Sequence, residues 1–233
     1  MPLTFPAHLF NPASVKLARV GQVVTSPGTI SGVVQALRTD GGGLWRVDYG
    51  VMGLRTHDQV RAWRAWEGEF DGGAQLVNIP VLDLRFAPRG LQGGKLARPG
   101  SLAVGSDIDP YFPEVVGYGS PLIVATIAPA ILRATTVTLD VAQGSRAQGG
   151  QTFEVDHPTF GKRVYQTGQV TAHPTATSTT LRIWPPLREA ITSTTSINFD
   201  WPCLTCRLVP DSDISPELTG GRGSVTAQFV EAF

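Results

Sequence analysis

The chain has 233 residues and a formal net charge of zero, with 19 Lys and Arg balanced by 19 Asp and Glu. A neutral chain has no bulk electrostatic attraction to nucleic acid or to an anionic membrane, so we expect neither as a stable partner. Only 16% of the residues are charged and 42% are hydrophobic. This low charge indicates that partner subunits cover much of the surface.

Turn-forming residues are frequent, with 26 Gly and 18 Pro and no low-complexity run. Together with recurrent Val, Thr and Ile, this composition predicts a mainly β fold. Two cysteines are too few for a disulfide scaffold. Residues 1–10 do not have the pattern of a signal peptide, and no apolar run is long enough to predict a membrane span. We therefore expect the protein to be kept in a reducing cytoplasm until it joins an assembly.

The first half begins with an irregular, Pro-rich stretch over 1–31 that includes a candidate strand at Val20–Thr25. A second candidate strand, Val33–Leu37, precedes the glycines at 41–43. After them, Trp45, Val47 and Tyr49 alternate with polar or smaller residues, which is typical of a half-buried strand. The sequence therefore predicts a hairpin around the glycines.

One helix is predicted after this hairpin. Thr56 is a favourable N-cap and Gln59 stands three residues later, as in a capping box. Val60, Trp63 and Phe70 fall on one face, with Trp66 at its edge, and the Asp-Gly-Gly at 71–73 ends the helix. A strand over 77–81 follows and contains Pro80.

The remaining patterns divide the chain into three parts. Residues 86–120 are rich in Gly and Pro and predict a linker with an extended loop. Residues 121–200 contain about six short strands with turns every 8–12 residues, which predicts a small barrel or sandwich. Long alternating strands return after residue 200, at 203–208 and 224–230.

No motif predicts catalysis. Cys203 and Cys206 form a C-x-x-C, but residues three apart in a strand point to opposite faces, so we expect neither a metal nor a redox site there. His157 and His173 are the better-placed histidines for general base chemistry, yet no nucleophile motif accompanies them. The lone Arg222 between glycines is a weak candidate for an RGG-like segment.

Two further candidates concern binding. Asp107, Asp109 and Glu114 could hold a cation, although Pro110 and Pro113 disrupt the spacing of a calcium loop. Most tryptophans are expected in the core or at a subunit interface. Trp184 is the exception, because Leu181 and Ile183 take the inward face of its strand and leave Trp184 on the other.

An ordered set of short motifs runs through the second half. It comprises Gly149–Val155, Arg163–Gly168, Thr180–Arg188, Cys206–Leu208 and Ser224–Phe233. This order resembles that of distal tail proteins of long-tailed (siphophage-type) bacteriophages, in which a G-x-x-F-x-V hairpin precedes an L-x-I-x-P-P-L-R strand and the chain ends near V-E-A-F. The strand at Leu44–Val47 and the Trp-rich helix from Thr56 are also similar to that family.

The resemblance implies a fold class, namely a tail-tube-like β-sandwich with one flanking α-helix plus an inserted small β-barrel. Residues 1–85 and 201–233 together would form the ring-forming domain, 86–120 a linker and extended loop, and 121–200 the inserted barrel. The implied function is that of a virion structural protein without enzymatic activity or cofactor.

In that role the chain would form a hexameric ring at the tail tip, between the tail tube protein and the tail-tip hub protein, after assembly in the host cytoplasm. DNA would pass through the ring without stable binding. Two alternatives stay open. One is a carbohydrate-binding module that uses Trp184 or Tyr165, and the other is a cell-wall hydrolase that depends on His157.

Overall fold

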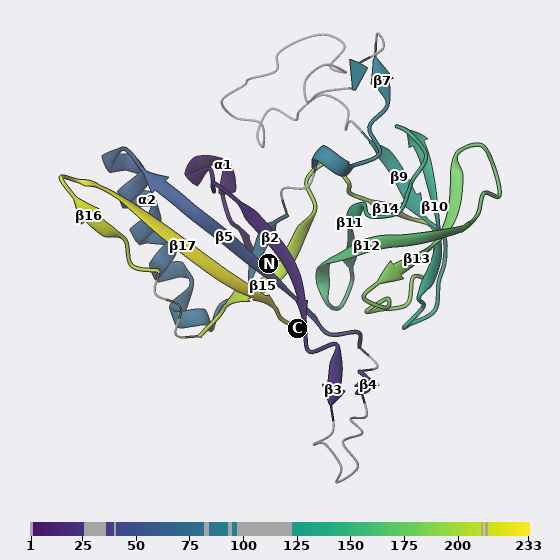
Figure 1. Ribbon diagram of the computed structural model, residues 1–233, viewed down its shortest axis with the longest axis horizontal. Coiled ribbons are helices and arrows are strands. Elements are labelled where there is room, and N and C mark those ends of the chain that lie inside the picture. Colours follow the sequence, from purple (N-terminus) through teal and green to yellow (C-terminus); the bar gives the residue numbers. More distant parts are fainter. Residues whose placement is uncertain are drawn as a thin grey trace. The chain divides into compact units, whose positions relative to one another are not determined.

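The computed structural model describes residues 2–25, 36–39, 41–81, 84–92, 95–96, 123–210, 212 and 214–233. The fold is mainly β, as predicted, and the chain separates into two compact units (Figure 1). Unit 1 comprises Met1–Leu82, Pro158–Arg163 and Cys203–Phe233, and unit 2 comprises Asp83–His157 and Val164–Pro202. The prediction had assigned residues 158–163 to the inserted domain, whereas they belong to unit 1.

Unit 1 is built on one seven-stranded sheet in the order β1-β6-β15-β17-β5-β2, with β16 attached to β17. The strands are β1 (Leu3–Thr4), β2 (Val15–Val20), β5 (Leu44–Leu54), β6 (Val77–Pro80), β15 (Cys203–Leu208), β16 (Glu217–Thr219) and β17 (Arg222–Glu231). Only β1 and β6 are parallel, and the other neighbours are antiparallel. A second sheet of a sandwich is not seen among the described residues of this unit.

The helix α2 (His57–Glu69) lies along β5 and β17 (Figure 1). Its N-terminus is as predicted, because the Thr56 side chain accepts a hydrogen bond from the Gln59 backbone N–H at 3.2 Å and Gln59 Oε1 accepts from the Thr56 N–H at 3.2 Å. Val60 and Trp63 are buried, as is the C-cap Phe70. The short 3-10 helix η1 (Asp71–Gly73) then turns the chain into β6.

An aromatic cluster fills the space between α2 and the sheet. Phe5 stands at its centre, with its ring centroid 6.0 Å from that of Trp63 and 6.1 Å from that of Phe229. Phe10, from the one-turn helix α1 (Ala7–Phe10), packs edge-on against Trp63 at 5.2 Å. The N-terminal segment, which the sequence predicted to be irregular, therefore supplies core residues to unit 1.

The predicted hairpin around the glycines at 41–43 is wrong. β5 pairs with β2, from Val20↔Leu44 to Val15↔Tyr49, and the two-stranded sheet of β3 (Val23–Thr25) and β4 (Ala36–Arg38) lies apart from this pairing. The physical reason is the close approach of Gly43 to β2, since a Cβ on Gly43 would lie 2.4 Å from the Val20 carbonyl oxygen. Gly43 therefore lies where the chain enters β5 and begins to pair with β2.

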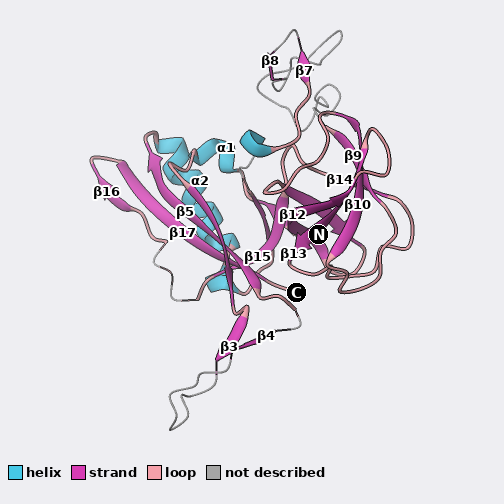
Figure 2. Cartoon of the chain, turned by 45° about the vertical axis from the view of Figure 1, so that its right-hand side comes forward, coloured by secondary structure: helices cyan, strands magenta, loops and turns pink. Residues whose placement is uncertain are grey.

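Unit 2 contains a six-stranded sheet in the order β11-β12-β13-β10-β9-β14, which curls into a nearly closed barrel (Figure 2). The strands are β9 (Val124–Ile127), β10 (Thr136–Gln143), β11 (Thr152–His157), β12 (Gly161–Ala172), β13 (Ser178–Trp184) and β14 (Thr195–Ile197). Glu154 and Asn198 bridge the two ends of this order through backbone hydrogen bonds of 2.8 and 3.0 Å.

The barrel core contains the alternating residues that the sequence predicted. Val137, Leu139 and Val141 of β10 are buried, as are Leu181 and Ile183 of β13. The predicted linker region is described only in part, with the 3-10 helix η2 (Leu84–Phe86) and the pair β7 (Leu91–Gln92) and β8 (Lys95–Leu96). Residues 97–122 lie outside the described residues, so the extended loop is not among the elements described.

Removal of the α2 cap should weaken unit 1. We expect Thr56→Ala to lower the free energy of unfolding by about 1 kcal/mol, because the Gln59 N–H loses its acceptor. Thr56→Ser, which keeps the hydroxyl, is the matched control. Urea unfolding followed by Trp fluorescence measures the difference, and an unchanged midpoint in Thr56→Ala would contradict the importance of the cap.

Candidate functional site

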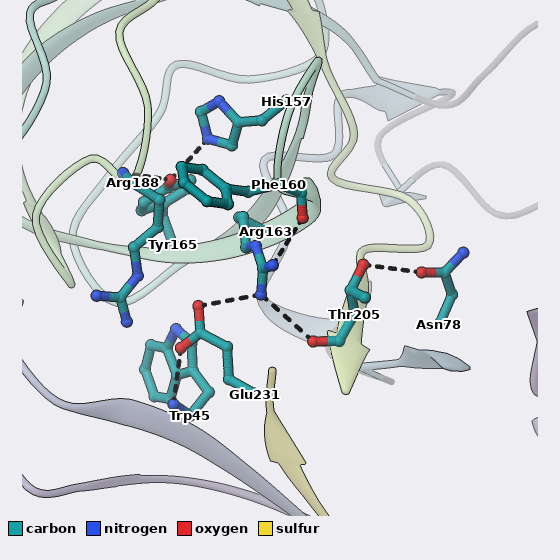
Figure 3. A network of polar contacts seen from close by, with 9 residues as sticks. All are labelled: Trp45, Asn78, His157, Phe160, Arg163, Tyr165, Arg188, Thr205 and Glu231. Carbon is teal, nitrogen blue, oxygen red and sulfur yellow. Dashed lines mark hydrogen bonds and ion pairs between the residues drawn. The ribbon is translucent and has the colours of Figure 1, made fainter. Parts of the chain in front are cut away.

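A buried polar network in unit 1 centres on the guanidinium of Arg163, whose side chain is 1% exposed. Arg163 follows Gly161, where the left-handed backbone (φ 68°) begins β12. Its Nη2 donates to the carbonyl oxygen of Phe160 at 2.6 Å and its Nη1 donates to that of Thr205 at 3.4 Å (Figure 3). The guanidinium therefore holds the 158–163 segment against β15.

The carboxylate of Glu231 lies opposite this guanidinium. Glu231 Oε1 is 3.6 Å from Arg163 Nη1, and Oε2 accepts a hydrogen bond from the Trp45 backbone N–H at 3.0 Å. Both side chains of the ion pair are 1% exposed. Ions this deeply buried are tolerated only when they are paired and hydrogen-bonded, and both conditions hold here.

The end of the chain packs over the same group. The Arg163 guanidinium carbon lies 4.3 Å from the centroid of the Phe233 ring, and the Phe160 ring meets Phe233 edge-on at 5.5 Å. Thr205 extends the network, because its hydroxyl donates to Asn78 Oδ1 at 3.0 Å (Figure 3). The network thus ties β5, β6, β15 and β17 to the 158–163 segment at one end of the sheet.

Sequence reasoning missed this ion pair. A signal was present, because Val225, Ala227 and Phe229 are core-facing and Glu231 continues their alternation. A carboxylate in a core-facing position predicts a buried cationic partner. The sequence does not identify Arg163 as that partner, since the two residues are far apart in the chain.

The two cysteines are buried in β15 and form no disulfide. Burial raises the pKa of the Cys206 thiol well above its usual value, the nearby Glu231 carboxylate raises this pKa further, and the Arg163 guanidinium lowers it. Cys203 pairs in register with Pro80 and Cys206 with Val77, so the two occupy positions three apart on a regular strand. This arrangement favours a packing role over the redox or metal role considered from the sequence.

The two histidines singled out from the sequence are both in unit 2. His157 is buried, and its Nε2 lies 2.7 Å from the Tyr165 hydroxyl, which accepts the Arg188 backbone N–H at 2.9 Å. The tautomer of His157 decides which of Nε2 and the Tyr165 hydroxyl donates in this contact. His173 is exposed, and its Nδ1 is 3.4 Å from the Thr179 hydroxyl. The structure does not bring the two histidines together in any described contact.

Trp184 lies at the end of β13 and is half-buried. A Cβ on Gly168 would lie 1.9 Å from Cζ3 of Trp184, so the indole packs directly against the glycine backbone of β12. Neither of the two pockets described in the structure is lined by Trp184 or Tyr165. These contacts give the indole a packing role on the barrel.

The remaining candidates from the sequence are the three acidic residues of a possible cation site and the glycines beside Arg222. Asp107, Asp109 and Glu114 lie outside the described residues. Gly220 and Gly221 form the two-residue turn between β16 and β17, with φ of 60° and 77°, which accounts for the glycines beside Arg222. Within the described ranges, no group of three or more His, Cys, Asp or Glu is placed to hold a metal ion, and no helix has the length and apolarity of a membrane span.

The surface of unit 1 offers a second kind of candidate site, at the edges of its sheet. β2 ends the strand order on one side and β1 on the other. A groove of about 460 Å³ lies beside β1, lined by Pro2, Leu3, Glu69, Ala74, Gln75, Leu76, Val77 and Arg207. Leu3 is 52% exposed there. Exposed strand edges are pairing surfaces for another chain unless something covers them.

Loss of one partner of the buried ion pair should be severe. We expect Arg163→Ala to lower the free energy of unfolding by about 3–5 kcal/mol, because Glu231 would remain buried without its cation. The double variant Arg163→Met/Glu231→Leu should recover most of this loss, because it removes both charges. Arg207→Ala, at an exposed position of β15, is the control and should change stability by less than about 0.5 kcal/mol. Equal losses in the single and double variants would show that the charge is not the cause.

The buried thiol of Cys206 should resist alkylation. We expect iodoacetamide at pH 8 to leave Cys206 unmodified in the native protein, because its raised pKa keeps the thiol protonated and burial blocks access. Peptide mass spectrometry reads the modification, and the same protein in guanidinium chloride is the control. Rapid native labelling of Cys206 would contradict the described packing of β15.

No protein-family model matches the chain, and no curated protein matches it. The resemblance to distal tail proteins therefore stays a prediction.

Proposed function

We propose that the protein is a virion structural protein of a long-tailed bacteriophage, a distal tail adaptor that forms a hexameric ring between the tail tube protein and the tail-tip hub protein. The observation that carries the proposal is the open sheet of unit 1. One face of this sheet carries α2 and the aromatic cluster, and both edges, β1 and β2, end without a further strand among the described residues. A sheet of this kind favours assembly through its edges.

The sheets of the two units differ in whether their end strands are joined. In unit 2, the Glu154–Asn198 bridge joins the ends of the strand order and nearly closes the barrel. Unit 1 has no such closure in the part of the chain that is described. Repetition of unit 1 around an axis would join each β2 edge to the next β1 edge, which satisfies every edge without an open end.

The face of the sheet opposite α2 also suits the proposed role. On that face Arg46 Nε donates to Asp48 Oδ1 at 2.7 Å, and Arg46 Nη2 donates to Gln228 Oε1 at 2.6 Å. The guanidinium is thus neutralised by side chains of its own sheet, and the net charge of the chain is zero. A surface of this kind would not retain DNA that passes through a ring.

The motifs behind the resemblance lie on consecutive strands. Phe153 and Val155 are buried in β11, Tyr165 in β12, and Leu181 and Ile183 in β13. The terminal motif Ser224–Phe233 contains β17 and the carboxylate that pairs with Arg163. The motifs of the resemblance thus lie on strands that build the core of unit 2 and on the strand that carries the buried carboxylate of unit 1.

The proposal predicts a ring. We expect purified full-length protein to have a mass by light scattering of six times the 24.9 kDa chain, and negative-stain images to show six-fold rings with a central hole. Arg182→Ala, on the exposed side of the barrel strand β13, is a control that should leave the mass unchanged. A strictly monomeric protein across a wide range of concentration, also absent from purified tails, would sink the proposal.

A further inference from the structure

The hairpin of β11 and β12 contributes residues to both compact units. Its two strands are neighbours in the barrel sheet of unit 2. The turn between them and the first residues of β12, Pro158–Arg163, belong to unit 1. β12 is therefore one continuous strand that begins in unit 1 and continues, from Val164 onward, in unit 2.

The unit 1 part of the hairpin is held by the buried polar network. Arg163 Nη1 lies 3.6 Å from Glu231 Oε1, and the same guanidinium donates to the carbonyl oxygens of Phe160 and Thr205 (Figure 3). Glu231 keeps its cation only while the hairpin turn stays in this position. Because a buried carboxylate without a partner is strongly unfavourable, unit 1 requires the turn in order to be stable.

The unit 2 part of the hairpin is held by the buried Tyr165. Its ring packs against Phe153 in the barrel core with the ring centroids 5.7 Å apart. Its hydroxyl lies 2.7 Å from His157 Nε2 and accepts the Arg188 backbone N–H at 2.9 Å. Only Val164 separates Tyr165 from Arg163, and an extended strand has no slack between two fixed residues this close.

Conformational entropy makes the turn depend on the folded barrel. If unit 2 unfolded, Pro158–Arg163 would be a short segment between two long unfolded stretches, 83–157 and 164–202. Docking it in unit 1 would then cost the backbone entropy of each of its residues and the closure of both loops. In the folded barrel the two strands already order the turn, so Arg163 reaches Glu231 at a much smaller entropic cost.

We propose that the hairpin of β11 and β12 couples the folding of the two units, so that a change in the stability of one unit appears in the other. The coupling runs through the strand that carries both Arg163 and Tyr165. By linkage, a ligand or partner that binds the folded barrel stabilises unit 1 as well. This device does not depend on the proposed ring and holds for the single chain.

Native-state hydrogen exchange of the full chain, read by peptide mass spectrometry, tests the coupling. Ile183→Val removes one methyl group from the barrel core. We expect the slowest amides of β15 and β17 in unit 1 to exchange about threefold faster or more, by the same factor as those of β10 in unit 2. Leu139→Ala, a larger deletion in the same core, should give a larger shared increase. An increase confined to unit 2 peptides would overturn the proposal.

An insertion into the hairpin tests whether the coupling runs through it. A Gly-Ser-Gly segment between Arg163 and Val164 supplies slack, so we expect Ile183→Val in this background to change exchange in unit 2 alone. The same segment between Thr192 and Ser193, in the exposed stretch before β14, is the matched control and should leave the response shared. A shared response despite slack in the hairpin would show that other contacts couple the units, and the proposal would fail.

A change on the unit 1 side supplies the reciprocal measurement. Glu231→Gln leaves Arg163 buried without its counter-charge, so we expect the slowest amides of β11 and β12 in unit 2 to exchange about tenfold faster or more. Glu217→Gln, which removes an exposed carboxylate from β16, is the control and should change neither unit. Unchanged exchange in unit 2 of Glu231→Gln, with faster exchange in unit 1, would contradict the coupling.

Discussion

The buried ion pair between Arg163 and Glu231 is the contact on which the arrangement of unit 1 depends. A guanidinium and a carboxylate lose several kcal/mol each when they leave water, and mutual attraction offsets this only with good geometry and further hydrogen bonds. Here the Phe160 and Thr205 carbonyls and the Trp45 N–H supply those hydrogen bonds. The Phe233 ring covers the guanidinium at 4.3 Å. The ion pair is therefore stabilising only when each segment that supplies one of these contacts is correctly placed.

This dependence links parts of the chain that are distant in sequence. Unit 1 is assembled from three separate segments, and the short middle one, Pro158–Arg163, contributes the cation. The pair constrains the position of this segment, because both side chains are 1% exposed and each is hydrogen-bonded to a backbone group. The pair thus makes residues 158–163 a required part of unit 1.

Local patterns were the predictable part of this structure. The Thr56 capping box placed α2 correctly, because both of its hydrogen bonds lie within four residues. The alternation of Val137, Leu139 and Val141 identified β10, because one face of a strand must enter the core. The predictions that were wrong concern pairing between strands that are distant in the sequence. β5 pairs with β2 because Gly43 allows a close approach to Val20, and the residues flanking the glycines carry no sign of that preference.

The N-terminal segment and the candidate site escaped prediction for related reasons. Phe5 and Phe10 belong to the core, but a two-residue strand and a one-turn helix are too short for any periodicity to be recognised. Glu231 continues a core-facing alternation, so the need for a buried partner was readable, while the choice of Arg163 depends on tertiary structure. The sheet edges pose the same problem, since strand order exists only in the folded chain.

Strand edges connect the fold to the proposed role. The barrel of unit 2 is nearly closed, because Glu154 of β11 and Asn198, next to β14, bridge the two ends of its strand order through backbone hydrogen bonds. The unit 1 sheet ends at β1 and β2, and these run in the same direction. Had they run in opposite directions, a head-to-tail joint that continues the sheet would pair its strands antiparallel. The observed direction commits such a joint to parallel pairing, which has slightly weaker backbone hydrogen bonds.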